Sequence, residues 1–261
     1  MIGLGVRPLL VERLRAAGCV YAEEEAALLL QTTSDPDELD RLVTQRVAGT
    51  PLEHLLGWVE FYGLRVAVAP GVFVPRRRTE LLVAEAVRLA GDRSRLVVVE
   101  VCCGAAAVAT ALTRMLDQPE VYAADLDPSA VACARRNLGD RGAVVQGDLF
   151  QPLPSRLSGR VDLLVANAPY VPAAAIALMP QEARNHEPAL ALDGGSDGLD
   201  VQRRVVAGAA DWLAPGGHLL VETGAEQAPH TAAMMASTGL ATRVATDVAR
   251  DATVVVGQRP R

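Results

Sequence analysis

VDLLVANAPY, residues 161–170, is the most informative stretch of this 261-residue chain. Its first six residues are almost continuously apolar, as in a strand of a parallel sheet that helices cover on both faces. Asn167 and Pro169 then interrupt the apolar run with turn-forming residues. Ligands of open parallel sheets bind beyond the carboxyl ends of the strands, so we predict a binding site at this turn.

On both sides of this stretch, apolar strand-like runs alternate with helical segments. Strands are expected at 96–101, 120–124, 142–146, 161–166, 217–222, 240–246 and 251–258. Helices fit residues 79–90, 106–116, 128–138 and 198–213. This alternation predicts an α/β fold with a doubly wound, mostly parallel sheet. Too few residues separate the last two strands for a crossover helix, so that pair is predicted to be antiparallel.

The N-terminal residues follow a different pattern. Apolar residues recur at three- and four-residue spacing over 8–17, 22–32 and 36–48, which predicts three short helices. Asp35 and Pro36 are the expected N-cap and first-turn residues of the third helix. Residues 57–70 alternate around Gly63, which indicates a β-hairpin. We therefore expect a helical substrate-recognition domain over 1–56, a hairpin linker over 57–74 and an α/β domain over 75–261.

Composition narrows the classes of function. Half of the residues are hydrophobic and 21% are charged, as in a packed globular protein. The net charge of −6 argues against a nucleic-acid partner, which would need clustered positive charge. The four cysteines lack zinc-ligand spacing, and no uncharged apolar run is long enough to span a membrane. We expect a cytoplasmic protein without a metal site, and no oligomeric state is predicted.

The loop after the first α/β strand is a candidate nucleotide-binding loop with few glycines. Glu100 and Cys102 precede a single Gly104, and alanines follow it. Such loops use glycine because it adopts positive φ and allows a ligand close to the backbone, whereas an alanine held at positive φ costs ~1 kcal/mol or more. A plain buried strand-to-helix turn explains this loop equally well.

Acidic residues end the next two predicted strands. Asp125 lies about 20 residues after the loop, where an acid can accept both hydroxyls of a ribose. Asp127 is instead interpreted as a helix N-cap, because Pro128 follows it. Asp148 could accept from an adenine amino group while Leu149 packs on the ring, although a lone Asp at a strand end is usually a turn former.

Residues 167–170 suit the recognition of a planar NH2 group. The carbonyls of Asn167 and Ala168 can accept both of its hydrogens, Pro169 fixes the turn, and Tyr170 offers a face for stacking. An amide or aromatic amine is a poor nucleophile. Catalysis on it would come from positioning its nitrogen and stabilising the charge that develops there. An Asn-X-Pro turn without a ligand is the alternative interpretation.

With these residues in place, nearly the whole chain resembles the HemK/PrmC-type protein-(glutamine-N5) methyltransferases. These enzymes methylate the glutamine of the Gly-Gly-Gln loop in peptide-chain release factors. The resemblance includes VPRRRTE at 74–80, HEP at 186–188 and LDGGSDGL at 192–199. It implies a seven-stranded, Rossmann-like sheet, S-adenosylmethionine (SAM) as cofactor, S-adenosylhomocysteine as product, and a protein substrate such as a release factor.

The resemblance also implies roles for individual residues. Cofactor binding would fall to Glu100, Cys102, Gly104, Asp125, Leu126, Asp148, Leu149 and Asn167. The catalytic turn would comprise Asn167, Ala168, Pro169 and Tyr170, and the acceptor would also contact Phe73, Arg76, Thr79 and Glu187. Two departures stand out, because the family's Asn-Pro-Pro-Tyr is Asn-Ala-Pro-Tyr here and two of three loop glycines, at 102 and 106, are replaced. We therefore predict weakened SAM binding.

Three other functions remain open from the sequence. A nicotinamide-dependent oxidoreductase would share the loop and Asp125, but it explains neither the turn at 167–170 nor the antiparallel ending. An N6-adenine methyltransferase uses a related turn, and the acidic charge argues against it. A non-catalytic binding protein that lost methyl transfer is favoured by the alanine-rich loop.

Overall fold

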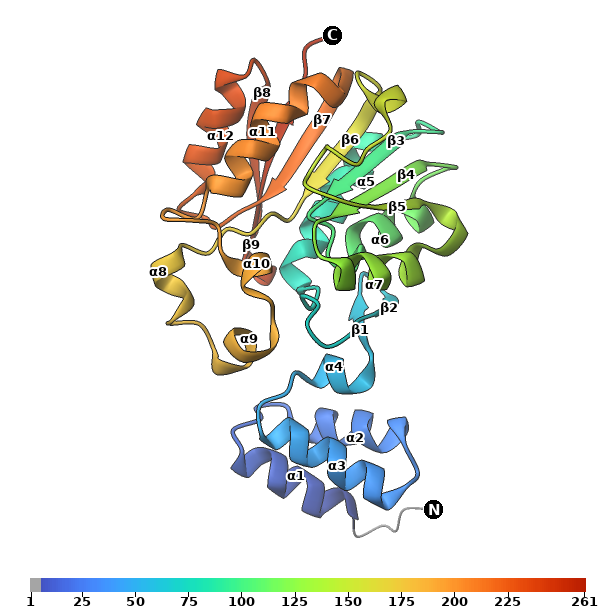
Figure 1. The fold of residues 1–261 in the computed structure, drawn as a ribbon, viewed down its shortest axis with the longest axis vertical. Helices are drawn as coiled ribbons and strands as arrows, with labels where there is room; N and C mark the ends of the chain where they lie inside the picture. Colours follow the sequence, from blue (N-terminus) through green and yellow to red (C-terminus); the bar gives the residue numbers. More distant parts are fainter. Residues whose placement is uncertain (1–5) are drawn as a thin grey trace.

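The structure is a computed structural model that describes residues 6–261, so the first five residues of the expected helical domain lie outside it. Its centre is a seven-stranded sheet with the order β5-β4-β3-β6-β7-β9-β8 (Figure 1). The parallel strands are β3 (Val97–Val101), β4 (Glu120–Asp125), β5 (Ala143–Gln146), β6 (Val161–Ala166) and β7 (Leu213–Glu222). Strand order reverses beside β3, where such sheets bind their ligands.

Antiparallel strands close the sheet at one edge. Strand β9 (Ala252–Gln258) runs antiparallel both to β7 and to β8 (Ala241–Asp247). The predicted antiparallel ending is thus confirmed, with the last strand inserted between its two neighbours. Strand β7 begins four residues earlier than expected, because Leu213 pairs with Val161 of β6 and a register shift follows before His218 pairs with Leu163.

Side chains of alternate strand residues build two cores, one on each face of the sheet. Val98, Ala123 and Leu163 pack on one face with α5 (Glu80–Ala90), α6 (Ala107–Met115) and α7 (Pro128–Leu138). Val99 and Leu164 pack on the other with α11 (Asp200–Trp212) and α12 (Ala228–Ser237). Every residue of β3 is buried, as its run of β-branched side chains predicts.

The N-terminal helices have a small core of their own. Helices α1 (Val6–Ala16), α2 (Ala22–Thr32) and α3 (Pro36–Val47) pack around Leu14, Leu29 and Val43. The Asp35 side chain caps α3 as predicted, and Asp127 caps α7 in the same way. A short helix, α4 (Leu52–Leu56), and the hairpin of β1 (Trp58–Phe61) and β2 (Leu64–Ala67) connect this group to the sheet (Figure 1).

Three short helices follow β6 and lie between the sheet and the N-terminal group (Figure 1). They are α8 (Ala173–Ile176), α9 (Gln181–His186) and α10 (Ala189–Leu192). The half-buried Arg46 of α3 pairs with Glu25 at 2.6 Å and also reaches Glu182 of α9 at 3.2 Å. This ion pair ties the segment to the N-terminal helices. Short 3-10 helices occupy Arg77–Thr79, Gly139–Arg141, Ser155–Leu157 and Val248–Arg250.

The helices of residues 6–261 are too short or too polar to cross a bilayer. Within the same residues, no group of three or more His, Cys, Asp or Glu side chains could hold a metal ion.

Candidate functional site

The carboxyl ends of the parallel strands open onto a cavity of about 550 Å³, a volume ordinary for a small-molecule site. Every residue that the sequence suggested for cofactor, catalysis or acceptor lines this cavity: Phe73, Arg76, Thr79, Glu100, Cys102, Gly104, Asp125, Leu126, Asp148, Leu149, Asn167, Ala168, Pro169, Tyr170 and Glu187. The fold therefore brings six separate segments to one place. Their individual roles stay predictions.

The loop after β3 keeps a glycine-like backbone without most of its glycines. Cys102, Gly104 and Ala106 have φ angles of 53°, 53° and 55°. The family that this chain resembles carries glycine at these three positions. A side chain is strained in this left-handed region, because its Cβ crowds the following carbonyl. Cys102 and Ala106 thus hold a backbone conformation that favours glycine, at a cost in backbone strain.

Side chains and neighbouring backbone hold this loop in place. The N–H of Gly104 donates to Asp125 at 2.7 Å, and the N–H of Cys103 donates to a β4 carbonyl at 3.1 Å. Asn137 of α7 donates to the carbonyl of Ala105 at 2.8 Å and exchanges two further hydrogen bonds with Ala67 of the hairpin. Asn137 was not predicted. It links the loop, helix α7 and the hairpin through a single buried amide.

Glu100 is a buried acid at the base of the loop. Its Oε2 atom accepts from the N–H of Ala109 at 2.7 Å, in the first turn of α6. Burial raises the pKa of Glu100 to about 8, with a further rise from the charge of Asp125 and an opposing effect from that hydrogen bond. A positive group in the cavity would favour the ionised form.

Two acids lie where the ribose and adenine of a nucleoside were predicted. Asp125 accepts from the N–H groups of Gly104 and Asp127, and burial raises its pKa. Each of its oxygens keeps a second lone pair for a ligand hydroxyl. Asp148 forms a 2.5 Å ion pair with Arg204 of α11. An adenine amino group would therefore share the Asp148 carboxylate with this guanidinium, which was not predicted.

The residues present fit a nucleoside-containing cofactor such as SAM. A Cβ built on Gly104 would meet no atom within 4 Å, so open space lies above the loop backbone. Leu126 is 48% exposed and lines the same cavity as Leu149, which provides apolar surface for a base. Asp125 supplies the acceptor that a ribose requires.

The turn at 167–170 has one end engaged by the protein and one end available. Asn167 donates through Nδ2 to the hydroxyl of Thr79 at 3.3 Å, and among the described residues nothing donates to its Oδ1. Ala168 and Pro169 are buried. The Asn167 carbonyl is thus the end of the side chain that remains for a ligand in the cavity. Thr79, predicted to contact the acceptor, also lies behind Asn167 and holds it.

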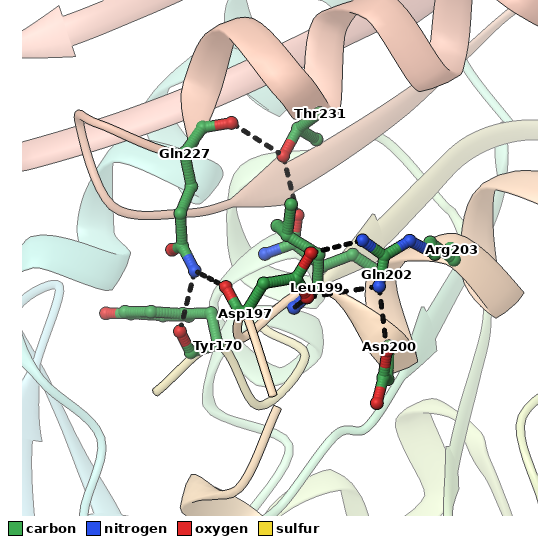
Figure 2. Close-up of polar contacts among 8 residues, drawn as sticks. All are labelled: Tyr170, Asp197, Leu199, Asp200, Gln202, Arg203, Gln227 and Thr231. Atoms are coloured by element: carbon green, nitrogen blue, oxygen red, sulfur yellow. Dashed lines mark hydrogen bonds and ion pairs between the residues drawn. The ribbon is translucent and has the colours of Figure 1, made fainter. Parts of the chain in front are cut away.

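Tyr170 is fixed at both its side chain and its backbone. Its hydroxyl donates to Glu222 at 3.2 Å, and burial together with that carboxylate raises the pKa of the phenol. Figure 2 shows the Gln227 amide reaching the backbone carbonyls of Tyr170 and Asp197, at 3.0 and 3.1 Å. These contacts join the turn to the loop before α11.

Three of the residues predicted to contact the acceptor interact with one another in the lining of the cavity. Glu187 forms an ion pair with Arg76 and accepts from the N–H of Val74 at 3.4 Å. The Arg76 guanidinium lies 5.4 Å from the centre of the Phe73 ring. The second oxygen of Glu187 is buried without a partner among the described residues. That orphan acceptor suits a donor from an incoming ligand.

Comparison with known proteins identifies the family. The chain is 41% identical over 211 residues to the release factor glutamine methyltransferase of Geobacter sulfurreducens, covering 78% of this chain and 72% of that relative. It belongs to the release factor glutamine methyltransferase family. The profile of a general methyltransferase domain family also matches residues 98–186, which span β3 to the helices after β6.

Two further proteins similar to this chain are also methyltransferases. A solved methyltransferase from Pyrococcus furiosus shares the fold, with a TM-score of 0.57, 16% identity, and coverage of 77% of this chain and 91% of that one. The 4-amino-L-phenylalanine/4-methylamino-L-phenylalanine methyltransferase of Streptomyces pristinaespiralis is 38% identical over 210 residues, covering 78% of this chain and 71% of that relative. Both findings agree with the predicted methyltransferase sheet.

Four residues around the site were not predicted from the sequence: Asn137, Arg204, Glu222 and Gln227. Glu222 left the clearest signal, because it ends the apolar run of β7 at the same sheet edge as the other candidates. The rule that polar residues at strand ends are site candidates, applied to β7, would have predicted Glu222. Asn137 lies inside an ordinary helical pattern, and Gln227 precedes a helix whose sequence has little helical period. The contacts of both residues are made with distant segments.

Proposed function

We propose that this chain transfers the methyl group of SAM to the side-chain nitrogen of a glutamine, in a protein substrate such as a peptide-chain release factor. The observation that supports it most is the single cavity that joins the strand-end carboxylates of Asp125 and Asp148 to the turn at 167–170. Membership of the release factor glutamine methyltransferase family supports the same reaction. A nicotinamide cofactor would leave that turn without a role.

SAM supplies an electrophilic methyl group on a positively charged sulfur. In this chain, Asp125 would hold the ribose, and Asp148 with Leu149 would hold the adenine. Glu100 and the backbone of Gly104 would face the methionine end. Because Glu100 and Asp125 are buried and carry raised pKa values, their ionised forms gain from a cation nearby.

Asn167 and Ala168 would hold the acceptor amide through their carbonyl oxygens. Two acceptors suit the two hydrogens of an NH2 group and leave the nitrogen facing the methyl donor. As the nitrogen gains positive charge, the same two dipoles stabilise it without needing to reorganise. The N–H proton becomes acidic only after that charge forms, so a strong base is unnecessary.

The decisive experiment locates the transferred label. The protein is incubated with methyl-labelled SAM and a release factor whose Gly-Gly-Gln loop is intact, and the product is mapped by mass spectrometry. We expect one labelled glutamine in that loop. The matched control substrate carries asparagine in place of this glutamine, which keeps the amide but shortens its reach. Label on the control substrate, or none on either, would refute the proposal.

An arylamine acceptor is the second candidate, and the 38% identical Streptomyces pristinaespiralis relative favours it. An aromatic amine also presents a planar NH2, so the carbonyls of Asn167 and Ala168 could hold it in the same way. Adding 4-amino-L-phenylalanine to the labelled-SAM assay tests this function directly. Turnover of the free amine without labelling of the release factor would select it.

A further inference from the structure

Residues 171–193, called the strap below, form a weakly packed wall of the cavity. The strap contains α8, α9 and α10, and Glu182 of α9 and Leu190 of α10 are among its residues in the cavity lining. Among the strap residues whose exposure is described, only Glu187 and Leu192 are buried. Few buried apolar contacts therefore hold the strap, and its polar contacts carry more of the task of fixing its position.

Backbone hydrogen bonds join the two ends of the strap. The N–H of Val171 donates to the carbonyl of Leu192 at 3.1 Å, and the N–H of Gly194 donates to the carbonyl of Val171 at 2.9 Å. Glu187 attaches the following part of the strap to Arg76 through an ion pair. Helix α9 lies away from this base and toward the N-terminal helices (Figure 1). A separate contact is therefore needed to hold α9.

Arg46, near the end of α3, supplies such a contact. Its Nη1 atom donates to Glu182 at 3.2 Å and to the carbonyl of Thr50 at 3.1 Å. Its other nitrogens donate to the two oxygens of Glu25 at 2.6 and 3.1 Å. The Arg46 side chain is 12% exposed and that of Glu182 is 39% exposed. One guanidinium thus fixes α2, α9 and the chain entering α4 relative to one another, and Pro51 at that entry lines the cavity.

We propose that Glu182 is a positioning residue, which holds the strap against the N-terminal helices through Arg46 and so fixes the acceptor end of the cavity. The proposal rests on the function proposed above, because a protein acceptor is large enough to contact both the strap and those helices. Glu187, which is predicted to contact the acceptor, belongs to the strap, whereas the residues predicted to bind the cofactor lie on other segments. Displacement of the strap should therefore weaken acceptor binding and spare SAM binding.

Glu182→Ala removes this ion pair and leaves Arg46 paired with Glu25. The lost contact is a charge-assisted hydrogen bond at a partly exposed site, so the strap should be displaced about three- to tenfold more often. A site whose wall is in place for only part of the time binds with an affinity reduced by that fraction. The KM for the release factor should rise by about twofold or more. The kcat at saturating acceptor and the Kd of SAM should each stay within about twofold.

Limited digestion with trypsin measures the position of the strap without any substrate. The strap has no lysine and one arginine, Arg184, which is exposed on α9. Trypsin cuts an extended segment, so α9 must leave its place and unwind before it is cleaved. When the strap moves faster than trypsin cuts, the rate of cleavage follows the population of the displaced strap. Cleavage after Arg184, identified by the masses of the fragments, should be about three- to tenfold faster in Glu182→Ala.

Asp40→Ala is the matched control. It removes an exposed ion pair with Arg13, at 2.6 Å, which joins α1 to α3 and does not involve the strap. Cleavage after Arg184, KM and kcat should all stay unchanged in this variant. Thermal denaturation should find the Tm of both variants within about 3 °C of the unaltered protein. A larger fall in Glu182→Ala alone would mean that the pair maintains the whole fold, and it would overturn the positioning role.

Two other results would also overturn the proposal. If cleavage after Arg184 is unchanged in Glu182→Ala, Glu182 does not hold the strap, and any rise in KM comes from direct contact with the acceptor. If cleavage becomes faster while KM is unchanged, the strap does not position the acceptor. If the unaltered protein labels no release factor, the proposed function fails, and the digestion still decides whether Glu182 holds the strap.

Discussion

Ala106→Gly measures the strain that the loop after β3 carries. Ala106 is fully buried with φ 55° and ψ 43°, and a left-handed conformation costs an L-residue about 1–2 kcal/mol. Glycine relieves that strain. It also loses the burial of a methyl group, about 0.8 kcal/mol, and adds about 0.4–1 kcal/mol of unfolded-state entropy. The net change in the free energy of unfolding should lie within about 1 kcal/mol of zero.

Ala105→Gly is the matched control. Ala105 is the adjacent residue, is 2% exposed, and is absent from the positive-φ residues. Its replacement loses the same methyl burial and adds the same entropy without relieving strain, so it should destabilise by about 1–2 kcal/mol. Urea denaturation without ligand should therefore find Ala106→Gly more stable than Ala105→Gly by about 1–2 kcal/mol, or roughly 2–8 °C in Tm. Equal losses in the two variants would refute the strain argument.

The remaining predictions concern the acceptor turn, the N-terminal helices and the cofactor end. Asn167→Ala should abolish methyl transfer while calorimetry finds SAM affinity nearly unchanged; retained turnover would exclude the assigned clamp. Arg46→Met leaves the buried Glu25 unpaired, so urea denaturation should show a loss of about 3–5 kcal/mol, whereas Arg13→Met breaks an exposed pair and should cost less than about 1 kcal/mol. Glu100 has a pKa of about 8 in the folded protein, above its ordinary value, so it ionises as pH rises through 8. The ratio of SAM to S-adenosylhomocysteine affinity should therefore increase from pH 6.5 to 8.5, because only SAM carries the sulfonium charge, and Glu100→Gln should flatten this dependence; a flat ratio in the unaltered protein would contradict it.

Local patterns predicted most of the sheet but missed helix α12 and the short helices α4, α8, α9 and α10. Strands such as β3 and β6 are nearly continuous apolar runs, and caps such as Asp127 have a fixed sequence form, so both could be found without tertiary information. Helix α12 was missed, because its alanine- and methionine-rich sequence has little amphipathic period and a proline in its first turn. Its burial against β8 and β9 stabilises it where local preference is weak.

Only part of the candidate site could be predicted from local sequence patterns. Asp125, Asp148 and Asn167 could be predicted because each ends a strand, and the topology of parallel sheets gathers strand ends at one edge. The hydrogen bonds that orient them could not be predicted. Thr79, Asn167 and Glu222 belong to three segments separated by more than fifty residues. The hydrogen bonds of Asn167 to Thr79 and of Tyr170 to Glu222 depend on how those segments pack. Sequence therefore indicated which groups meet in the cavity, and packing determines which atoms face it.

In the proposed reaction, the acids around the cavity would also favour release of the product. Burial raises the pKa of Glu100, Asp125 and Glu187, so their ionised forms are costly in the ligand-free protein. A sulfonium at the methionine end would offset part of that cost for Glu100 and Asp125. Methyl transfer would remove the positive charge from the sulfur. The same carboxylates would then no longer attract the ligand electrostatically. The burial that disfavours these charges in the ligand-free protein would thus make ligand affinity depend on the positive charge that the proposed reaction removes.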